Sequence, residues 1–436
     1  MIKRVLLALA IVVISILVLG VLFFDRIPNL WSEGAGPRRV FFADNISTAH
    51  AAIIARFNEL HRGRIEVVPV NLPFTKFSTN ERKELLARSL RSRSDRIDVF
   101  AVDLIWVTRF SKWAEPMGRH FPPESLATIL PQALESCTVD GALMAVPLYI
   151  DVGLLYYRSD IIRRLPDAPA IEEALRRSIT WDELTALRDR LGYRGRPFYV
   201  FQGKAYEGLI CNYFEHVASQ DRRAVPRDSF PLQTAAARGA LERLVNLVRV
   251  DRVAPPGVVD YDEIRSYTAM LDSDAVFVRG WPNFLESFRS MYPDTAKLNL
   301  VRIAALPHER GGSLSPVFGG WNLMVANSSA NKDAAMEFVR FTQSVEAQKL
   351  LLEIGGYIPV NTSLYRDAAY MEAHPTLQFT SGLIERGVHR PAIEDYTRVS
   401  DIVSLYINRA LRGEIPPAQA GELAAEAIRT NRTFGE

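Results

Sequence analysis

The sequence predicts an α/β protein with two lobes, and both the length of the chain and the order of its elements support this prediction. The chain has 436 residues, of which 48% are hydrophobic, so it can bury a large core and divide into two lobes. Between residues 39 and 102, short runs of β-branched and aromatic residues alternate with segments that have the apolar spacing of helices. This order is typical of a parallel sheet with right-handed crossover connections.

The first element of the chain is an apolar segment from Val5 to Phe24, which follows Lys3 and Arg4. With about 20 residues, it is long enough to cross the ~30 Å hydrocarbon layer of a membrane. Basic residues on its short side predict a cytoplasmic N-terminus and a protein body outside the membrane. Neither a small-residue cleavage site nor a cysteine directly follows the segment. We therefore expect residues 1–36 to form an uncleaved anchor and a linker, rather than a cleaved signal or a lipid-anchored start.

Three strands with two intervening helices are expected next. The strands are predicted at 39–43, 65–70 and 97–102. The candidate N-cap residues of the helices are Ser47 or Thr48 and Thr79. Because the carboxyl ends of parallel strands meet at one edge of the sheet, we expect Asp44–Ser47, Asn71 and Asp103 to lie near one cleft.

The stretch Val146–Asp160 is almost continuously apolar, and its β-branched and aromatic content predicts a strand that is buried on both faces. Asp151 lies in the middle of this stretch and Gly153 follows shortly after. A carboxylate inside an apolar strand is costly unless it has partners. Asp151 is therefore either a hydrogen-bonded core residue or a ligand-binding carboxylate where the chain passes between two lobes.

Later elements continue the α/β pattern. Further strands are expected at 198–202, 275–278 and 300–305, and the last of these is a candidate for a second crossing between the lobes. Thr180 begins a capping-box pattern that predicts the start of a helix. The region from Leu364 onward is predicted to be mostly helical.

Charge and motifs restrict the function. The net charge is +2 with acids and bases well mixed, so no field of one sign indicates a nucleic-acid partner. The sequence has no G-x-S-x-G, Walker, H-E-x-x-H or dinucleotide-binding motif, and we expect neither an enzyme nor a cofactor. The many acids leave open a carboxylate pair for glycoside hydrolysis, although no pair stands out.

Cys137 and Cys211 can form one bridge or remain two buried thiols, and they offer no zinc-like spacing.

Three tryptophans suggest a sugar site. Trp106, Trp281 and Trp321 are each predicted at a strand-to-helix junction or in a glycine-rich loop. An exposed indole can stack on the C–H face of a sugar, whose hydroxyls bond to acids and amides. The alternative for a single tryptophan is a role in core or lobe packing. We expect that packing role for Trp113 and Trp181, and a ligand-binding role for Trp281 and Trp321, whose Pro or Gly neighbours favour loops.

Six stretches of the chain are informative when they are taken in order, namely Asp98–Trp106, Pro147–Tyr157, Thr180–Leu184, Gln202–Leu209, Gly319–Asn322 and Gly356–Val360. Together they resemble the extracytoplasmic solute-binding proteins of ABC importers, in the family that includes maltose- and trehalose-binding proteins. The resemblance implies two α/β lobes, joined by crossing strands, that close on a sugar in the cleft between them. We expect lobe one at 37–150 and 306–350, and lobe two at 151–305 and 351–436.

The resemblance also implies which residues contact the ligand. The implied contacts, with Trp106 added from the tryptophan set, are Asp103, Trp106, Tyr149, Asp151, Trp281, Trp321 and Arg390. Arg82 resembles an arginine early in the second helix of the family, but we expect it to be a surface residue. The family often has an acid in the loop after the first strand, where this chain has Asn45, so its sugar preference can differ. We expect substitution of Asp151 or Trp321 to weaken binding without unfolding the protein, since neither is predicted to be a core side chain.

The resemblance implies that the chain is the substrate-binding component of an ABC carbohydrate importer. It is expected to capture a mono- or oligosaccharide in the periplasm, or at the outer face of the membrane, and present it to the permease. Two alternatives remain, namely a membrane-anchored glycoside hydrolase and a relative that senses sugar or binds another protein without transport. The expected partners are a sugar, the permease transmembrane subunits and, through residues 5–24, the membrane.

Overall fold

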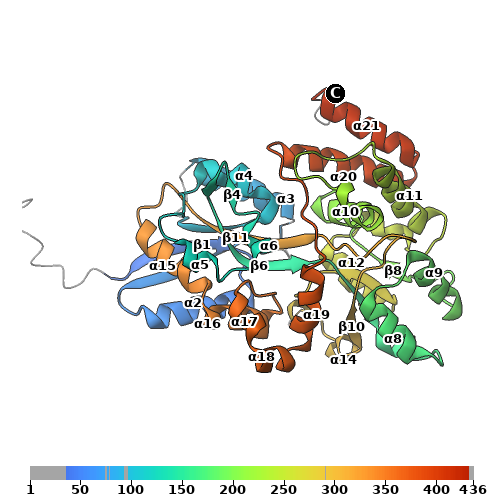
Figure 1. Ribbon diagram of the computed structural model, residues 1–436, viewed down its shortest axis with the longest axis horizontal. Helices are drawn as coiled ribbons and strands as arrows, with labels where there is room; N and C mark the ends of the chain where they lie inside the picture. Colours follow the sequence, from blue (N-terminus) through green and yellow to red (C-terminus); the bar gives the residue numbers. More distant parts are fainter. Residues whose placement is uncertain (1–35, 74–75, 78, 93–96, 290, 432–436) are drawn as a thin grey trace, which may run out of the picture.

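The computed structural model describes residues 36–73, 76–77, 79–92, 97–289 and 291–431. The described chain forms two lobes side by side along the long axis of the molecule, and each lobe is built around one main sheet (Figure 1). The predicted α/β fold with two lobes is therefore confirmed. The predicted anchor, Val5–Phe24, lies outside the described residues. Among the residues that are described, no helix has the length and apolar character needed to span a membrane.

The sheet of the first lobe has the strand order β2-β1-β3-β11-β6. Its strands are β1 (Arg38–Asp44), β2 (Ile65–Asn71), β3 (Val99–Asp103), β6 (Val146–Val152) and β11 (Phe318–Val325). β1 pairs in parallel with both β2 and β3, as the alternation of strands and helices predicts. β11 arrives from much later in the chain and pairs antiparallel with β3 and β6. The first three strands thus end at the same edge as the beginning of β11.

The sheet of the second lobe has the order β10-β7-β9-β8. Its strands are β7 (Leu154–Arg158), β8 (Tyr199–Val200), β9 (Phe277–Gly280) and β10 (Val301–Ala304). β10, which the sequence suggested as a second crossing, belongs to this sheet and pairs antiparallel with β7. The chain returns to the first sheet only after β10, through residues 305–317. A separate two-stranded ribbon joins β4 (Thr138–Val139) to β5 (Ala142–Leu143).

Helices cover both sheets. The longer ones are α2 (Thr48–Leu60), α3 (Thr79–Ser92), α8 (Ala168–Arg177), α9 (Trp181–Arg190), α10 (Glu207–Gln220), α11 (Ala235–Arg249), α12 (Glu263–Asp272), α15 (Lys332–Thr342), α16 (Val345–Gly355), α19 (Pro375–Ile384), α20 (Tyr396–Arg412) and α21 (Pro417–Arg429). The shorter ones are η1 (Leu104–Trp106), α4 (Val107–Phe110), η2 (Ser111–Trp113), α5 (Pro123–Leu126), α6 (Pro131–Leu134), α7 (Ser159–Ile162), η3 (Arg222–Ala224), η4 (Pro256–Asp260), α13 (Phe284–Arg289), α14 (Thr295–Leu298), α17 (Thr362–Arg366) and α18 (Ala368–Ala373).

Local sequence signals start several of these helices. Ser47 caps α2 by accepting a hydrogen bond from the backbone N–H of His50. Thr180 and Glu183 form the predicted capping box at the start of α9, with the Thr180 backbone N–H donating to the Glu183 carboxylate at 2.6 Å. Each cap satisfies backbone groups that the helix itself leaves unpaired.

The prediction of one strand over Val146–Asp160 is wrong, because Gly153 divides the stretch into β6 and β7, which belong to different sheets. A Cβ atom at Gly153 would lie only 2.0 Å from the Glu215 Oε1 atom. The close approach of Glu215 therefore requires glycine where the chain leaves the first sheet and enters the second. Both halves are buried throughout, as the apolar sequence predicts.

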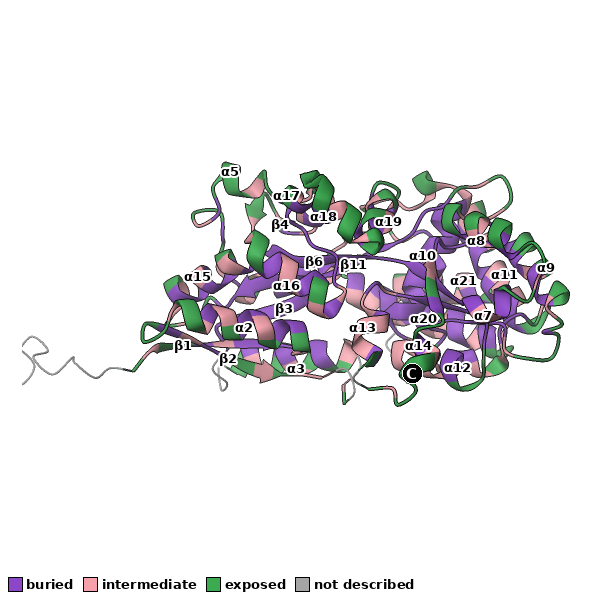
Figure 2. Cartoon of the chain, turned by 90° about the horizontal axis from the view of Figure 1, so that it is seen from below, coloured by how far each residue is buried: buried purple, intermediate pink, exposed green. Residues whose placement is uncertain are grey.

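Each lobe has its own hydrophobic core. One cluster of buried side chains surrounds the first sheet and includes residues of α2, α3, α15 and α16, while a larger one surrounds the second sheet and reaches α10, α11 and α20. Figure 2 shows buried residues along the central strands and exposed residues on the outer helices. Cys137 and Cys211 are two separate buried thiols, and burial raises the pKa of the Cys137 thiol to about 12.

Candidate ligand-binding site

A cavity of about 540 Å³ lies between the lobes and is lined by residues of both. Five of the predicted ligand contacts are among its lining residues, namely Asp103, Tyr149, Asp151, Trp281 and Trp321. The other two, Trp106 and Arg390, do not line it. The cavity volume is within the range of about 300–1,000 Å³ that is typical of small-molecule sites.

Strand register brings four of these five residues together. In β11, Trp321 lies opposite Asp103 of β3 on one side and opposite Tyr149 of β6 on the other. Gly319, two residues earlier in β11, lies opposite Asp151. Directly opposed residues of antiparallel strands are close neighbours, with Cβ atoms roughly 5 Å apart. The floor of the cavity is therefore formed where β3 and β6 end and β11 begins.

Asp151 is a buried carboxylate whose Oδ1 atom accepts no hydrogen bond from the described residues. Its pKa is raised to about 7, first by burial and then by the negative charge of Asp103, while the positive charge of Arg279 opposes the shift. Near neutral pH the carboxyl group is therefore divided between its two protonation states. In either state it can pair with a hydroxyl group that enters the cleft.

Asp103 lies at the end of β3, where its Oδ1 atom accepts a hydrogen bond from the backbone N–H of Ile105. Arg390 donates to the same carboxylate at 3.1 Å and to Glu207 at 2.5 Å. Burial raises the pKa of Asp103, and the Arg390 guanidinium opposes that effect. Arg390 is thus buried behind the cavity wall, where it holds two acids that line the cleft.

Trp281 follows β9 directly, at the strand-to-helix junction that the sequence predicts. Its backbone N–H donates to the Tyr267 hydroxyl at 2.9 Å, and its indole Nε1 lies 3.5 Å from Glu263 Oε1. Burial raises the pKa of the Glu263 carboxyl. These contacts hold the indole at the second-lobe side of the cavity.

Trp321 lies in the strand β11, so the prediction that it occupies a glycine-rich loop is wrong. The preceding Gly320 has a φ of +125° inside the strand, and a Cβ atom there would lie 2.6 Å from the Tyr149 carbonyl oxygen. The glycines thus allow close strand pairing rather than a loop. Trp106 lies behind Trp321 and packs edge-on against it, with ring centroids 6.2 Å apart.

Arg82 is buried, which contradicts the prediction of a surface residue. Its Nη2 atom donates to Asp44 Oδ1 at 2.8 Å. Burial alone would raise the pKa of the Asp44 carboxyl, but His50 and Arg82 together lower it below its usual range. The nearby Asn45 lines the cavity at the position where the family often has an acid.

Several lining residues were not predicted as ligand contacts, among them Ser47, Tyr206, Glu207, Glu263 and Tyr357. Tyr206, Glu207 and Tyr357 lie in stretches that carry the family resemblance, so the motif positions were the available signal. Burial raises the pKa of the Tyr357 hydroxyl to about 12, so it remains a neutral donor. Glu263 begins α12, and no motif in the sequence marks it.

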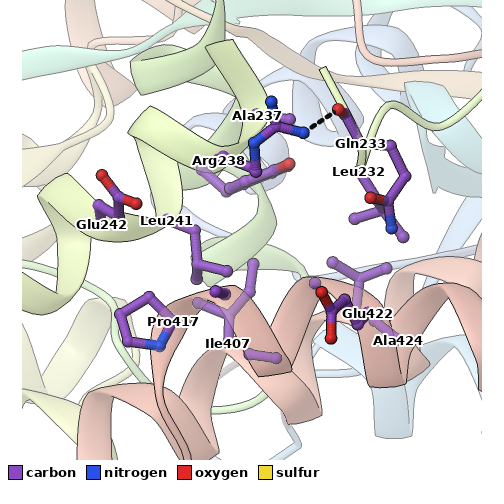
Figure 3. A pocket seen from close by; sticks show the side chains of 15 residues that line it. Leu232, Gln233, Ala237, Arg238, Leu241, Glu242, Ile407, Pro417, Glu422 and Ala424 are labelled. Atoms are coloured by element: carbon purple, nitrogen blue, oxygen red, sulfur yellow. Dashed lines mark hydrogen bonds between the residues drawn. The ribbon is translucent and has the colours of Figure 1, made fainter. Parts of the chain in front are cut away.

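A second, smaller cavity of about 100 Å³ lies between α11, α20 and α21 in the second lobe. Figure 3 shows its lining, in which Leu241, Ile407 and Pro417 form an apolar floor with Glu242 and Glu422 at the edges. None of the predicted ligand contacts lines it. The larger cavity between the lobes is therefore the candidate ligand-binding site.

Comparison with known proteins supports this choice. The sequence profile of the family described as bacterial extracellular solute-binding protein matches residues 42–349. The chain is 27% identical over 355 residues to a probable ABC transporter-binding protein of Deinococcus radiodurans, covering 78% of this chain and 81% of that protein. It is 23% identical over 397 residues to a mannitol-binding protein of Pseudomonas aeruginosa, covering 83% of this chain and 86% of that protein.

Solved structures have the same fold. Maltose-bound MalE3 of T. maritima matches with a TM-score of 0.78 and 26% identity, over 90% of this chain and 100% of that one. An ABC transporter solute-binding protein of Agrobacterium vitis with bound D-mannitol matches with a TM-score of 0.72 and 19% identity, over 90% of this chain and 98% of that one.

The family match confirms the resemblance drawn from the motifs, and with it the prediction of a binding protein rather than an enzyme. It also agrees with the prediction that the body of the protein lies outside the cytoplasm. The chain belongs to the family of bacterial extracellular solute-binding proteins.

Proposed function

We propose that this chain is the substrate-binding component of an ABC carbohydrate importer, which captures a mono- or oligosaccharide between its lobes and presents it to the permease. The observation that carries the proposal is the cavity of about 540 Å³, in which Trp281 and Trp321 come from different lobes. They accompany a buried carboxylate oxygen of Asp151 that has no hydrogen-bond partner among the described residues. Aromatic faces suit the C–H surfaces of a sugar, and a carboxyl group suits its hydroxyls.

The relatives support a neutral polyhydroxylated ligand. The T. maritima structure has maltose bound, and a curated relative is described as mannitol-binding. A sugar and a sugar alcohol share several adjacent hydroxyls and an apolar carbon face. The cavity offers carboxylates, phenols and indoles that match both features.

We further propose that the ligand is held by closure of the two lobes. The main parts of lobe one are 37–150 and 306–350, and those of lobe two are 151–305 and 351–436, while Asp151 itself remains in β6 of the first sheet. Asp103, Tyr149 and Trp321 contribute from the first sheet, and Trp281, which follows β9, contributes from the second lobe. The crossing at Gly153, two residues after Asp151, is the proposed hinge. In this arrangement, closure removes water from Asp151 and increases the strength of its bond to the ligand.

The proposal for the cellular setting is that residues 5–24 anchor the protein at the outer face of the membrane. Such a tether would keep the binding protein close to its permease, which increases their effective concentration. N-terminal sequencing of the mature protein tests this step, since a mature chain that starts after Phe24 contradicts the anchor.

The test of the binding function is a thermal-shift screen of the purified protein against maltose, trehalose, D-mannitol and ribitol. A ligand that binds only the folded state raises the melting temperature by mass action. A hit is then followed by calorimetric titration and by chromatography of the recovered sugar. Recovery of unchanged sugar supports a binding protein, whereas cleavage of a disaccharide would favour the glycoside hydrolase. No shift with any of these compounds would contradict the proposed ligand class.

A further inference from the structure

We propose that Arg279 and Arg82 are positioning residues, which hold the two cleft tryptophans from behind so that their opposite faces meet the ligand. The proposal rests on the cavity between the lobes being the ligand site. Trp281 and Trp321 line this cavity, whereas neither arginine is among the described residues that line it. Each arginine nevertheless lies over the ring of one of these tryptophans.

The contact in the second lobe is the tighter one. The guanidinium carbon of Arg279 lies 3.8 Å from the centroid of the Trp281 ring, which is the distance of a stacked pair. Arg279 and Trp281 are separated by one residue at the end of β9, and alternate residues of an extended chain point to the same side. The Nη1 atom of Arg279 is buried and has no hydrogen-bond acceptor among the described residues.

Glu215 fixes the orientation of this guanidinium. Arg279 Nη2 donates to Glu215 Oε1 at 2.6 Å, and Arg279 Nε donates to Oε2 at 3.2 Å. A two-point contact of this kind sets the plane of the guanidinium as well as its position. Replacing a buried ion pair by apolar side chains of similar size is often neutral for stability, so we assign the pair a geometric role. Fixing the indole of Trp281 is the geometric role that the contact supplies.

The first lobe repeats this arrangement with unrelated parts of the chain. The guanidinium carbon of Arg82, from α3, lies 4.4 Å from the centroid of the Trp321 ring in β11. Arg82 is held in turn by Asp44 at the end of β1, with Nη2 to Oδ1 at 2.8 Å. Both members of this pair are buried. In each lobe, an acid orients an arginine and the arginine lies against a cleft tryptophan.

The pair in the second lobe also touches the crossing strands. Glu215 Oε1 packs against Gly153, where a Cβ atom would come within 2.0 Å of it. On the other side, the Trp281 ring packs against Gly319 of β11, where a Cβ atom would lie 2.9 Å from the ring. Trp281 thereby touches the first sheet directly at Gly319, and the acid that orients Arg279 touches the crossing between the sheets at Gly153. An indole fixed in advance loses less side-chain freedom when the ligand binds, which favours affinity.

The experiment uses the full-length protein labelled with fluorotryptophan and observed by fluorine NMR. The six tryptophans give separate resonances, which single Trp→Phe replacements assign. The test variants are Arg279→Lys, which keeps a cation beside Glu215 but lacks the guanidinium plane, and the double variant Arg279→Met with Glu215→Gln, which removes both charges. Arg196→Met is the matched control, because Arg196 lies 5.8 Å from the Tyr193 ring and Tyr193 is outside the cavity.

Both test variants are expected to shift and broaden the Trp281 resonance, while the resonance of Trp181, buried in the second-lobe core, stays unchanged. The control is expected to change neither resonance. The affinity for maltose or D-mannitol, whichever the native protein binds, is expected to fall about tenfold in the test variants. Arg82→Lys should change the Trp321 resonance in the same manner.

An unchanged Trp281 resonance in the Arg279 variants would overturn the proposal. Equal changes at Trp281 and Trp181 would also overturn it, because they would indicate a general loss of packing. The NMR readout needs no sugar, so it separates this proposal from the proposed function. If the Trp281 resonance responds as expected while neither maltose nor D-mannitol binds the native protein, the positioning role stands and the proposed ligand class fails.

Discussion

Asn80 on α3 donates a hydrogen bond of 2.9 Å to Asp401 on α20, and this contact joins the two lobes beside the ligand cavity. α3 packs into the core of the first lobe and α20 into that of the second. Lys83, one turn further along α3, places its Nζ atom 3.7 Å from the same carboxylate. Thr79, at the start of α3, lines the cavity. The described conformation is therefore one in which the lobes touch at the rim of the cleft.

Asp401→Ala is expected to weaken this closed conformation. It removes the acceptor of Asn80 and leaves the buried ammonium of Lys83 with only Glu84, at 3.9 Å, among its ion-pair partners in the described chain. We expect the affinity for the bound sugar to fall several-fold, because part of the binding energy must then close the lobes. Calorimetric titration measures the affinity, and X-ray scattering of the sugar-free protein measures the radius of gyration. Asp395→Ala is the control, since the ion pair of Asp395 within the described residues is the local one with Arg398. Equal affinity in both variants would contradict the role of Asp401.

Asp151→Asn is expected to weaken sugar binding about tenfold or more, which is a loss of at least ~1.4 kcal/mol in binding free energy. The substitution keeps the shape of the side chain but removes a charged acceptor, and a hydrogen bond to a charged group is worth about 1.5–3 kcal/mol. Titration of the native protein and the variant measures the change. Thermal melts recorded beside it identify the opposite case, in which Asp151 is a structural residue and the melting temperature falls while the affinity stays the same.

The raised pKa of Asp151 predicts how stability changes with pH. In the folded protein this pKa is about 7, whereas the ordinary pKa of an aspartate side chain is 3.8, so between these values the folded state binds more protons than the unfolded state. The contribution of Asp151 to the free energy of unfolding should therefore fall as pH rises from about 4 to about 7, and should be flat above that range. Asp151→Asn removes this dependence, so the sugar-free variant should be more stable than the native protein at pH 8. Denaturant unfolding of both proteins at pH 5 and pH 8 tests the sign. If the difference in the free energy of unfolding between the native protein and the variant is the same at both pH values, the prediction is contradicted.

Trp321→Ala is expected to lower both affinity and stability, which differs from the expectation drawn from the sequence. Trp321 is only 8% exposed and belongs to the first-lobe core. Removing a buried tryptophan costs on the order of 3–5 kcal/mol through lost burial and the remaining cavity.

Trp281→Ala is the better test of stacking, because Trp281 is less buried than Trp321. It should lose affinity with a smaller change in melting temperature. Chemical unfolding and titration of both variants separate the two effects.

Gly153→Ala is expected to destabilise the junction between the sheets. The new methyl group would lie 2.0 Å from Glu215 Oε1, so Glu215 must move away from Arg279. We expect a loss of roughly 1–3 kcal/mol, as is typical of overpacking in a dense core. Gly118→Ala is the control, because a Cβ atom at Gly118 meets no atom within 4 Å. If both variants melt at the same temperature, the close approach at Gly153 is not required for stability.

Short-range signals determined much of the first lobe. The strands and helices between residues 39 and 102 follow from local apolar spacing, and the caps at Ser47 and Thr180 follow from hydroxyl side chains beside that spacing. The stretches around Asp103, Asp151 and Trp321 were sufficient to indicate the family. They also contain four of the predicted ligand contacts that line one cavity, and the tryptophan pattern added the fifth, Trp281. These features depend on residue types that are close together in the chain, so the sequence by itself determined them.

Tertiary structure alone decided the features that depend on distant pairing. The insertion of β11 between β3 and β6 makes Trp321 a neighbour of Asp103 and Tyr149, and no local pattern encodes that register. The break at Gly153 depends on Glu215, which approaches from α10. An arginine on a helix is expected at the surface when only the sequence is known. Arg82 is buried because Asp44, at the end of β1, lies beside it and accepts its hydrogen bond. Periodicity reports which face of an element is apolar, whereas the partners of a buried charge are set by packing between elements that lie far apart in the chain.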